Sequence, residues 1–204
     1  MGLIMNHLQK IVEKFKLDKV IADWGEIDFE KFSNQKSLFS YQQEALENAI
    51  KALFLYYEEY KGDKSNFYKH YQNNGLEADL SYNLKKESKT VKYLLEYDKE
   101  YEIKDDKISF EYFINRMCFW MATGSGKTLV IVKLLELIGY LMQYNKIPKK
   151  DILFLTYRDD LLDQFQKHIT EFNSFANNIS INLIDLKQYA SNKHNLSLKF
   201  DNAI

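Results

Sequence analysis

The sequence predicts an α/β fold in which helices flank a parallel sheet, incomplete in this chain and preceded by an N-terminal helical region. The first observation is a glycine-rich segment at 121–128, which follows an apolar run at 117–121 and precedes a helical apolar pattern at 129–142. The second is a continued alternation of strand and helix patterns, at 152–156 (strand), 159–172 (helix) and 179–184 (strand). Such alternation is typical of parallel sheets with right-handed crossovers. Pro148, the only proline, falls between the first of these helices and the next strand, where a helix should already have ended.

Three regions follow from these patterns: an N-terminal helical region at 1–60, a polar insertion at 61–106, and the sheet-forming region at 107–204. In the first region, apolar spacing predicts an amphipathic helix over 2–16 and a second helix over 41–57. Ser40 is a suitable N-terminal cap for the second helix. The insertion is rich in Lys, Tyr, Asn and Glu, has weak periodicity, and is predicted to be partly helical at 90–97.

The composition indicates a globular chain without a global charge field. Of its 204 residues, 46% are hydrophobic, and 28 basic residues nearly balance 29 acidic ones. Any contact with DNA must therefore come from a local face. The single cysteine, Cys118, lies in the first predicted strand and is expected to be a small buried hydrophobe. The four histidines lack metal-ligand spacing, so we predict no structural zinc.

Neither a membrane span nor a signal peptide is predicted. The longest apolar segment, 129–142, contains charged residues and is too short to cross a bilayer. The N-terminal helix lacks the apolar core of a signal peptide. We therefore expect a cytoplasmic protein without membrane contact.

Residues 121–128 read Met-Ala-Thr-Gly-Ser-Gly-Lys-Thr and have the spacing of a Walker A phosphate loop. Gly124 and Gly126 allow successive backbone N–H groups to point at phosphate oxygens, in front of the positive end of the next helix. Lys127 should reach the β and γ phosphates, and the Thr128 hydroxyl is placed to bind Mg²⁺. The alternative is a strand-to-helix turn that contains Gly-x-Gly-Lys-Thr by chance. The predicted ligand is Mg-ATP, with Lys127 and Thr128 catalytic and with the binding residues Ala122, Thr123, Gly124, Ser125, Gly126, Lys127 and Thr128.

These motifs together resemble the beginning of a superfamily 2 helicase-like ATPase of the DEAD/DEAH-box kind, in particular the R subunits of type III or type I restriction enzymes. The segment Phe-Ser-Tyr-Gln-Gln-Glu-Ala at 39–45 resembles the Tyr-Gln-x-x-Ala element of that group. Residues 121–128 resemble motif I, in which Met at the first position is usual. Residues 156–164, Thr-Tyr-Arg-Asp-Asp-Leu-Leu-Asp-Gln, resemble motif Ia. The resemblance implies a RecA-like ATP-binding domain, of which 107–204 would be the first, truncated part.

The resemblance also implies roles for three residues outside the phosphate loop. Gln42 would bind adenine, because a carboxamide carries both a donor and an acceptor and can pair with N6 and N7 together. Thr156 and Arg158 would contact the DNA backbone at a helix N-terminus, although Asp159 and Asp160 in the same turn repel DNA. The alternatives are a solvated helix glutamine for Gln42, and a plain helix cap and a surface arginine for the other two.

Some parts of a complete helicase-type ATPase are absent from the sequence. No Asp-Glu dipeptide occurs, so motif II is missing, as are a second RecA-like domain with its arginine finger and any nuclease site. Asp185, after the strand at 179–184, is the nearest substitute for a carboxylate that binds Mg²⁺ and water. Whether the chain is an enzyme is therefore left open at this point.

Three functional hypotheses remain open from the sequence. The first is an ATP-binding, N-terminal fragment of a DNA-dependent ATPase of the restriction-translocase type, with DNA and a methyltransferase or specificity subunit as partners implied by the resemblance. The second is a self-contained small P-loop kinase or ATPase, whose site Asp185 completes. The third is an inert gene remnant with exposed sheet edges.

Overall fold

A computed structural model of the chain describes residues 7–76, 81–83, 93, 103–104, 107–156, 158–175 and 179–184. Its contacts divide the chain into two compact units. Unit 1 consists of Met1–Lys16 and Ile50–Phe119, and unit 2 consists of Leu17–Ala49 and Trp120–Ile204.

Unit 1 is a small helical assembly with a short antiparallel sheet. Its helices are α1 (His7–Lys14), the end of α3 (Ser40–Phe54), a π-helical turn (Leu55–Glu59), α4 (Lys64–Asn73) and a 3-10 turn (Phe110–Phe113). The carboxylate of Asp63 caps α4 by accepting a hydrogen bond from the Asn66 backbone N–H at 3.0 Å. The strands β1 (Ser81–Asn83), β2 (Ile103–Lys104) and β3 (Lys107–Ser109) pair in the order β1-β3-β2. The buried core is apolar and aromatic, comprising Ile11, Val12, Ala52, Leu55, Tyr56, Phe67, Tyr71, Leu76 and Ile114.

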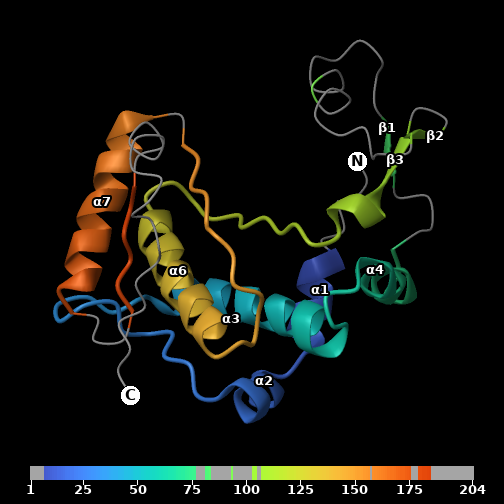
Figure 1. The fold of residues 1–204 in the computed structure, drawn as a ribbon, viewed down its shortest axis with the longest axis horizontal. Coiled ribbons are helices and arrows are strands. Elements are labelled where there is room, and N and C mark those ends of the chain that lie inside the picture. Colours follow the sequence, from blue (N-terminus) through green and yellow to red (C-terminus); the bar gives the residue numbers. More distant parts are fainter. Residues whose placement is uncertain are drawn as a thin grey trace. The chain divides into compact units, whose positions relative to one another are not determined.

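Unit 2 carries the segments that the sequence singles out. Its helices are α2 (Leu17–Trp24), the first part of α3, α6 (Lys127–Gln143) and α7 (Asp159–Asn173). Helices α6 and α7 lie side by side (Figure 1). The apolar face of α7 supplies Phe165, Ile169 and Phe172, all buried, and the ring of Phe172 packs 5.9 Å from that of Phe32. The observed helices agree closely with the expected helices at 41–57, 129–142 and 159–172.

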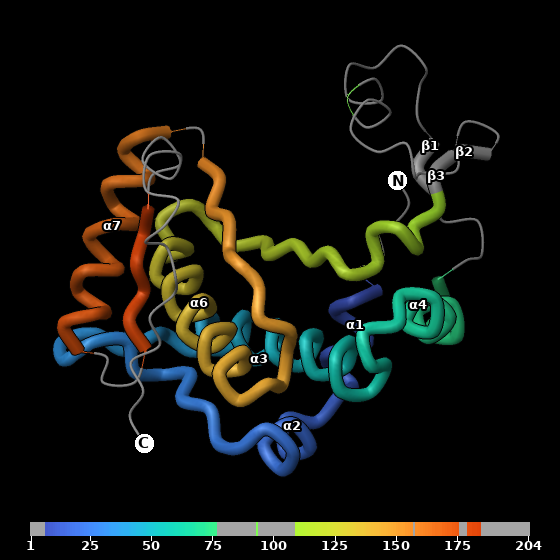
Figure 2. Tube along the Cα trace, viewed as in Figure 1, coloured from blue at the N-terminus to red at the C-terminus, as the bar shows by residue number. Residues whose placement is uncertain are grey.

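The prediction of a parallel sheet with flanking helices is wrong for the part of the chain that the structure describes. The only strands there are the three short antiparallel ones of unit 1. Residues 117–121, 152–156 and 179–184 are not strands (Figure 1). Figure 2 shows the course of the chain through these segments. An apolar run indicates that a segment tends to be buried. A strand also requires a neighbouring strand with which its backbone can form hydrogen bonds.

The segments around Ile181 and Phe154 contact side chains of α7, where a strand in a sheet would contact the backbone of a neighbouring strand. The backbone of Ile181 pairs with a side chain: its N–H donates to Asn173 Oδ1 at 2.9 Å, and its carbonyl accepts from Asn173 Nδ2 at 2.8 Å. Phe154 stacks on Phe165 of α7 with ring centroids 4.1 Å apart, while Leu153 and Leu155 are 63% and 75% exposed. These segments are therefore held by α7 rather than by neighbouring strands.

Three further expectations can be compared with the structure. Cys118 is exposed, not buried, because the run that contains it is not covered by a sheet, and Trp120 beside it is 98% exposed. The helix α4 lies inside the expected polar insertion, at a place where no helix was expected. The expected helix at 90–97 lies outside the described residues except for Tyr93, as do residues 2–6 of the expected first helix.

Among the residues described, no helix combines the length and the apolar character needed to cross a membrane.

Candidate nucleotide-binding site

The phosphate loop, residues 121–128, forms a tight turn that leads directly into α6. Gly124 and Gly126 both have positive φ angles, +78° and +75°, which favour glycine because other residues are strained there. Helix α6 begins at Lys127, and the Leu129 N–H donates to the Gly126 carbonyl at 3.0 Å. The loop therefore lies in front of the positive end of a 17-residue helix.

The side chain of Lys127 folds back over this loop. Its Nζ donates hydrogen bonds to the carbonyl oxygens of Met121 at 2.9 Å and Ala122 at 2.7 Å. The ammonium group therefore lies against the first two residues of the loop. It must exchange these two bonds for phosphate oxygens if an anion enters.

Gln42 lies against the phosphate loop, although the two are 83 residues apart in sequence. Its side chain is 2% exposed; Nε2 donates to the Ser125 carbonyl at 2.8 Å, and Oε1 accepts from the Phe39 N–H at 2.9 Å. The hydroxyl of the neighbouring Tyr41 donates to the same Ser125 carbonyl at 3.1 Å. Sequence reasoning noted the Tyr-Gln pair but assigned no role to the tyrosine. Tyr41 and Gln42 are called the Tyr-Gln element below.

Gly126 is also needed for this close approach. A Cβ atom built on Gly126 would lie 2.5 Å from Gln42 Nε2, whereas a Cβ on Gly124 would meet nothing within 4 Å. The two glycines therefore have different tasks. Gly126 admits the Tyr-Gln element, and Gly124 leaves the outer side of the loop open.

Two observations test whether these residues fit a bound nucleotide. The Ser125 Oγ is buried and has no hydrogen-bond partner among the residues that the structure describes, so a donor is available inside the loop. Beside the loop, the rings of Phe39 and Tyr41 stack nearly parallel, with centroids 5.8 Å apart and an interplanar angle of 14°, and both are exposed. Open space over Gly124, a buried donor and Lys127 together suit a polyphosphate.

The second candidate segment, Thr156 and Arg158, lies at the N-terminus of α7. Thr156 Oγ1 accepts a hydrogen bond from the Arg158 N–H at 3.4 Å. The guanidinium of Arg158 donates from Nε to Asp160 Oδ1 at 2.8 Å and from Nη2 to Asp160 Oδ2. The bond from Arg158 lowers the pKa of Asp160. The arginine is thus already paired with a carboxylate in its own turn, and Asp185 lies outside the described residues.

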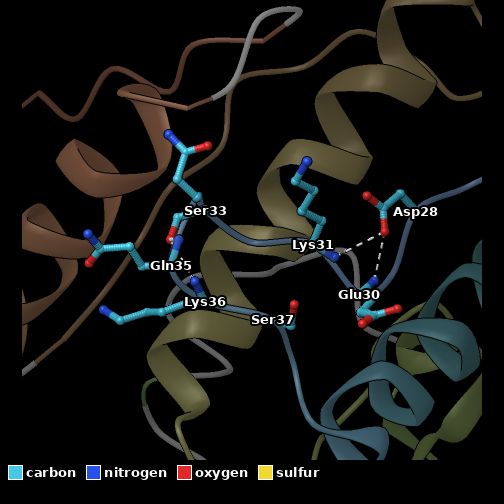
Figure 3. A pocket seen from close by; sticks show the side chains of 8 residues that line it. Asp28, Glu30, Lys31, Ser33, Gln35, Lys36 and Ser37 are labelled. Atoms are coloured by element: carbon cyan, nitrogen blue, oxygen red, sulfur yellow. Dashed lines mark hydrogen bonds between the residues drawn. The ribbon is translucent and has the colours of Figure 1, made fainter.

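A polar loop at 28–37 precedes the Tyr-Gln element and surrounds a pocket of about 440 Å³ (Figure 3). Asp28 Oδ1 accepts from the N–H groups of Glu30 and Lys31 at 2.9 and 3.0 Å. Ser33 Oγ donates to Glu171 Oε1 at 2.8 Å, and Lys36 Nζ donates to Glu171 Oε2 at 2.5 Å. This loop is therefore attached to α7. No local sequence pattern predicts these contacts, because Glu171 lies 138 and 135 residues from its two partners.

A buried lysine attaches the same loop to α6. The side chain of Lys133 is 3% exposed, and its Nζ donates to the Lys31 carbonyl at 2.8 Å and pairs with Glu136 Oε2 at 2.7 Å. Desolvation raises the pKa of Glu136, and the neighbouring Lys133 opposes that rise. Contacts to both α6 and α7 thus hold the loop that leads into the Tyr-Gln element.

Comparison with known protein families identifies the class of protein to which the chain belongs. The family of the type III restriction enzyme, res subunit, matches residues 35–202, a range that begins just before the Tyr-Gln element and includes the phosphate loop and α7. The chain belongs to this helicase-like family. The resemblance inferred from the motifs is confirmed at this level. At the level of the family, this match supports ATP binding and membership of a restriction system.

Searches of curated proteins and of solved structures found no match to the chain.

Proposed function

We propose that this chain is the nucleotide-binding part of a DNA-dependent ATPase of the restriction R-subunit type. The observation that carries the proposal is the contact between Gln42 and the phosphate loop, at 2.8 Å between Nε2 and the Ser125 carbonyl. Two segments that sequence patterns assign to one ligand meet in space, although nothing local in the sequence requires it. Membership of the family supports ATP and Mg²⁺ as the ligands and DNA as the partner.

In this proposal the loop residues 122–128 bind the phosphates through backbone N–H groups and through Lys127. The Lys127 ammonium leaves the carbonyls of Met121 and Ala122 and neutralises charge on the β and γ phosphates. The Thr128 hydroxyl supplies one oxygen ligand to Mg²⁺, whose role is to offset phosphate charge. Gln42 retains a second amide hydrogen and a second lone pair, which suit N7 and N6 of adenine.

The proposed DNA contact is at the N-terminus of α7. Thr156 and the first backbone N–H groups of the helix are suited to a phosphate, as in other helix N-terminal anion sites. Arg158 contributes a charge only after it leaves Asp160. A methyltransferase or specificity subunit as a further partner rests on the family alone.

The test is calorimetric titration of Mg-ATP and Mg-GTP into the chain, its Lys127→Ala variant and a Lys149→Ala control. Lys149 is an exposed lysine of unit 2 outside the loop. We expect ATP to bind the original chain and the control equally and to lose most of its affinity in Lys127→Ala. We also expect ATP to bind more tightly than GTP. Equal binding by the original chain and Lys127→Ala would overturn the assignment of the loop.

A further inference from the structure

The carbonyl of Ser125 accepts two hydrogen bonds from consecutive residues of one helix. Helix α3 begins at Ser40, so that Tyr41 and Gln42 lie in its first turn. The Tyr41 hydroxyl and the Gln42 amide reach the same oxygen at 3.1 and 2.8 Å. A role for Gln42 in binding adenine accounts for the contact of Gln42 with the loop. It gives no reason for the hydrogen bond from the Tyr41 hydroxyl.

Fixing this carbonyl also fixes the next backbone N–H. The described peptide bonds are trans, so the Ser125 carbonyl and the Gly126 N–H lie in one plane and point in opposite directions. Because the carbonyl is directed at the Tyr-Gln element, the Gly126 N–H is directed away from it. In a loop of this kind the N–H groups that point inward are the ones that bind phosphate oxygens.

We infer that Tyr41 is a positioning residue for phosphate binding: its hydroxyl holds the Ser125–Gly126 peptide plane and thereby the orientation of the Gly126 N–H. The inference rests on the proposed function and deepens it. It divides the Tyr-Gln element into two roles, with Gln42 setting the preference for the base and Tyr41 the affinity for the polyphosphate, whatever the base.

The geometry makes the hydroxyl separable from the ring. The Tyr41 ring is 46% exposed and stacks on Phe39. Tyr41→Phe removes only the oxygen and leaves that stack in place. Phe39→Leu removes the stacked ring and leaves the Tyr41 hydroxyl in place. The backbone N–H of residue 39, which donates to Gln42, also remains. Tyr144→Phe is a matched control, because Tyr144 is a 58% exposed tyrosine at the far end of α6.

The experiment measures the affinities of the full chain and its variants for Mg-tripolyphosphate, Mg-ATP and Mg-GTP. Loss of one neutral hydrogen bond predicts that Tyr41→Phe weakens all three by one common factor of about threefold. Phe39→Leu and Tyr144→Phe should bind tripolyphosphate as the original chain does. The thermal unfolding midpoint of each variant reports whether it remains folded.

Two results would overturn the inference: tripolyphosphate binding unchanged in Tyr41→Phe, or a loss in that variant confined to ATP. Failure of the proposed function has a different signature, in which Lys127→Ala binds all three ligands as the original chain does. A Tyr41→Phe variant that unfolds earlier and yet keeps its tripolyphosphate affinity also counts against the inference.

Discussion

The phosphate loop before α6 and the segment before α7 (152–156 and 158) have similar sequence patterns but different structures. In each case an apolar run, at 117–121 or 152–156, precedes the first turn of a helix, α6 or α7. The phosphate loop is fixed by partners far away in the sequence, above all Gln42. In the segment before α7, the Arg158 N–H donates to Thr156 Oγ1, the Arg158 guanidinium donates to Asp160 in the same turn, and Leu153 and Leu155 are exposed.

The comparison indicates which of the two proposed binding sites, for nucleotide or for DNA, is already ordered by contacts within the described residues. Long-range contacts order a loop before its ligand arrives, and this lowers the cost of binding. A local Arg–Asp pair has the opposite effect, because it must be broken before the arginine can bind DNA. The proposed nucleotide site is therefore preorganised. In the proposed DNA contact, by contrast, the charge of Arg158 is neutralised by Asp160.

The largest expected effect comes from the ion pair between Lys133 and Glu136, which attaches the loop at 28–37 to α6. Lys133→Met removes the donor to the Lys31 carbonyl and leaves Glu136 partly buried without its cation. We expect a loss of about 2–3 kcal/mol in the free energy of unfolding, measured in urea at pH 7. The exposed Lys149→Met is the control, and equal stability of the two variants would contradict this account.

The same variant should change the pH dependence of stability. Desolvation already raises the pKa of Glu136, and loss of Lys133 removes the main opposing effect. A carboxyl whose pKa is raised in the folded state binds protons more tightly there than in the unfolded chain. The contribution of Glu136 to the stability of the folded chain is thus present at low pH and is lost as pH rises through the raised pKa. The loss of stability in Lys133→Met should therefore be smaller in acid than at pH 7.

The next effect separates the two glycines of the phosphate loop. Gly124→Ala introduces a Cβ at a positive φ but meets no neighbour, so the expected cost is about 1–2 kcal/mol. Gly126→Ala adds a collision with Gln42 Nε2 and should cost about 1 kcal/mol more. Chemical unfolding of the two variants measures the difference, and equal losses would show that the close contact with Gln42 does not form.

A smaller effect concerns the attachment of loop 28–37 to α7. The hydrogen bond from Lys36 is the main cause of the lowered pKa of Glu171, and Ser33 adds to it. A lowered pKa gives stability that is present above the unfolded value and lost as pH falls through the folded one. Glu171→Gln should cost at most about 1 kcal/mol at pH 7, since the pair is partly exposed, and this variant should lose less stability on acidification. Glu44→Gln, an exposed change on α3, should keep the pH dependence of the original chain.

The smallest effect tests the DNA side of the comparison. Asp160→Asn removes the carboxylate that holds Arg158, whereas Asp159→Asn removes the same charge without touching that pair. Asp160→Asn should bind a labelled DNA duplex about threefold more tightly at low salt, and more tightly than Asp159→Asn. Fluorescence anisotropy at two salt concentrations measures this. An equal gain in both variants would reduce the effect to net charge and argue against a role for Arg158.

The sequence predicted the parts of the molecule that local patterns determine. Helix periodicity located α6 and α7 within a few residues, and the spacing of Gly124, Gly126 and Lys127 located the turn before α6. The parallel sheet was predicted wrongly, because an apolar run does not specify its hydrogen-bonding partner. Asn173, whose side chain pairs with the backbone of Ile181, carries no signal of that role in its local sequence. The roles of the site residues and the division into 1–60, 61–106 and 107–204 stay predictions.

The most direct test of the central claim, that the Tyr-Gln element and the phosphate loop form one nucleotide-binding site, is hydrogen exchange measured by mass spectrometry with and without Mg-ATP. The account predicts that ATP slows exchange in peptides covering 121–130 and 39–46 together, and that Lys127→Ala abolishes both effects. Protection of 121–130 without 39–46, or no protection of either segment, would contradict it.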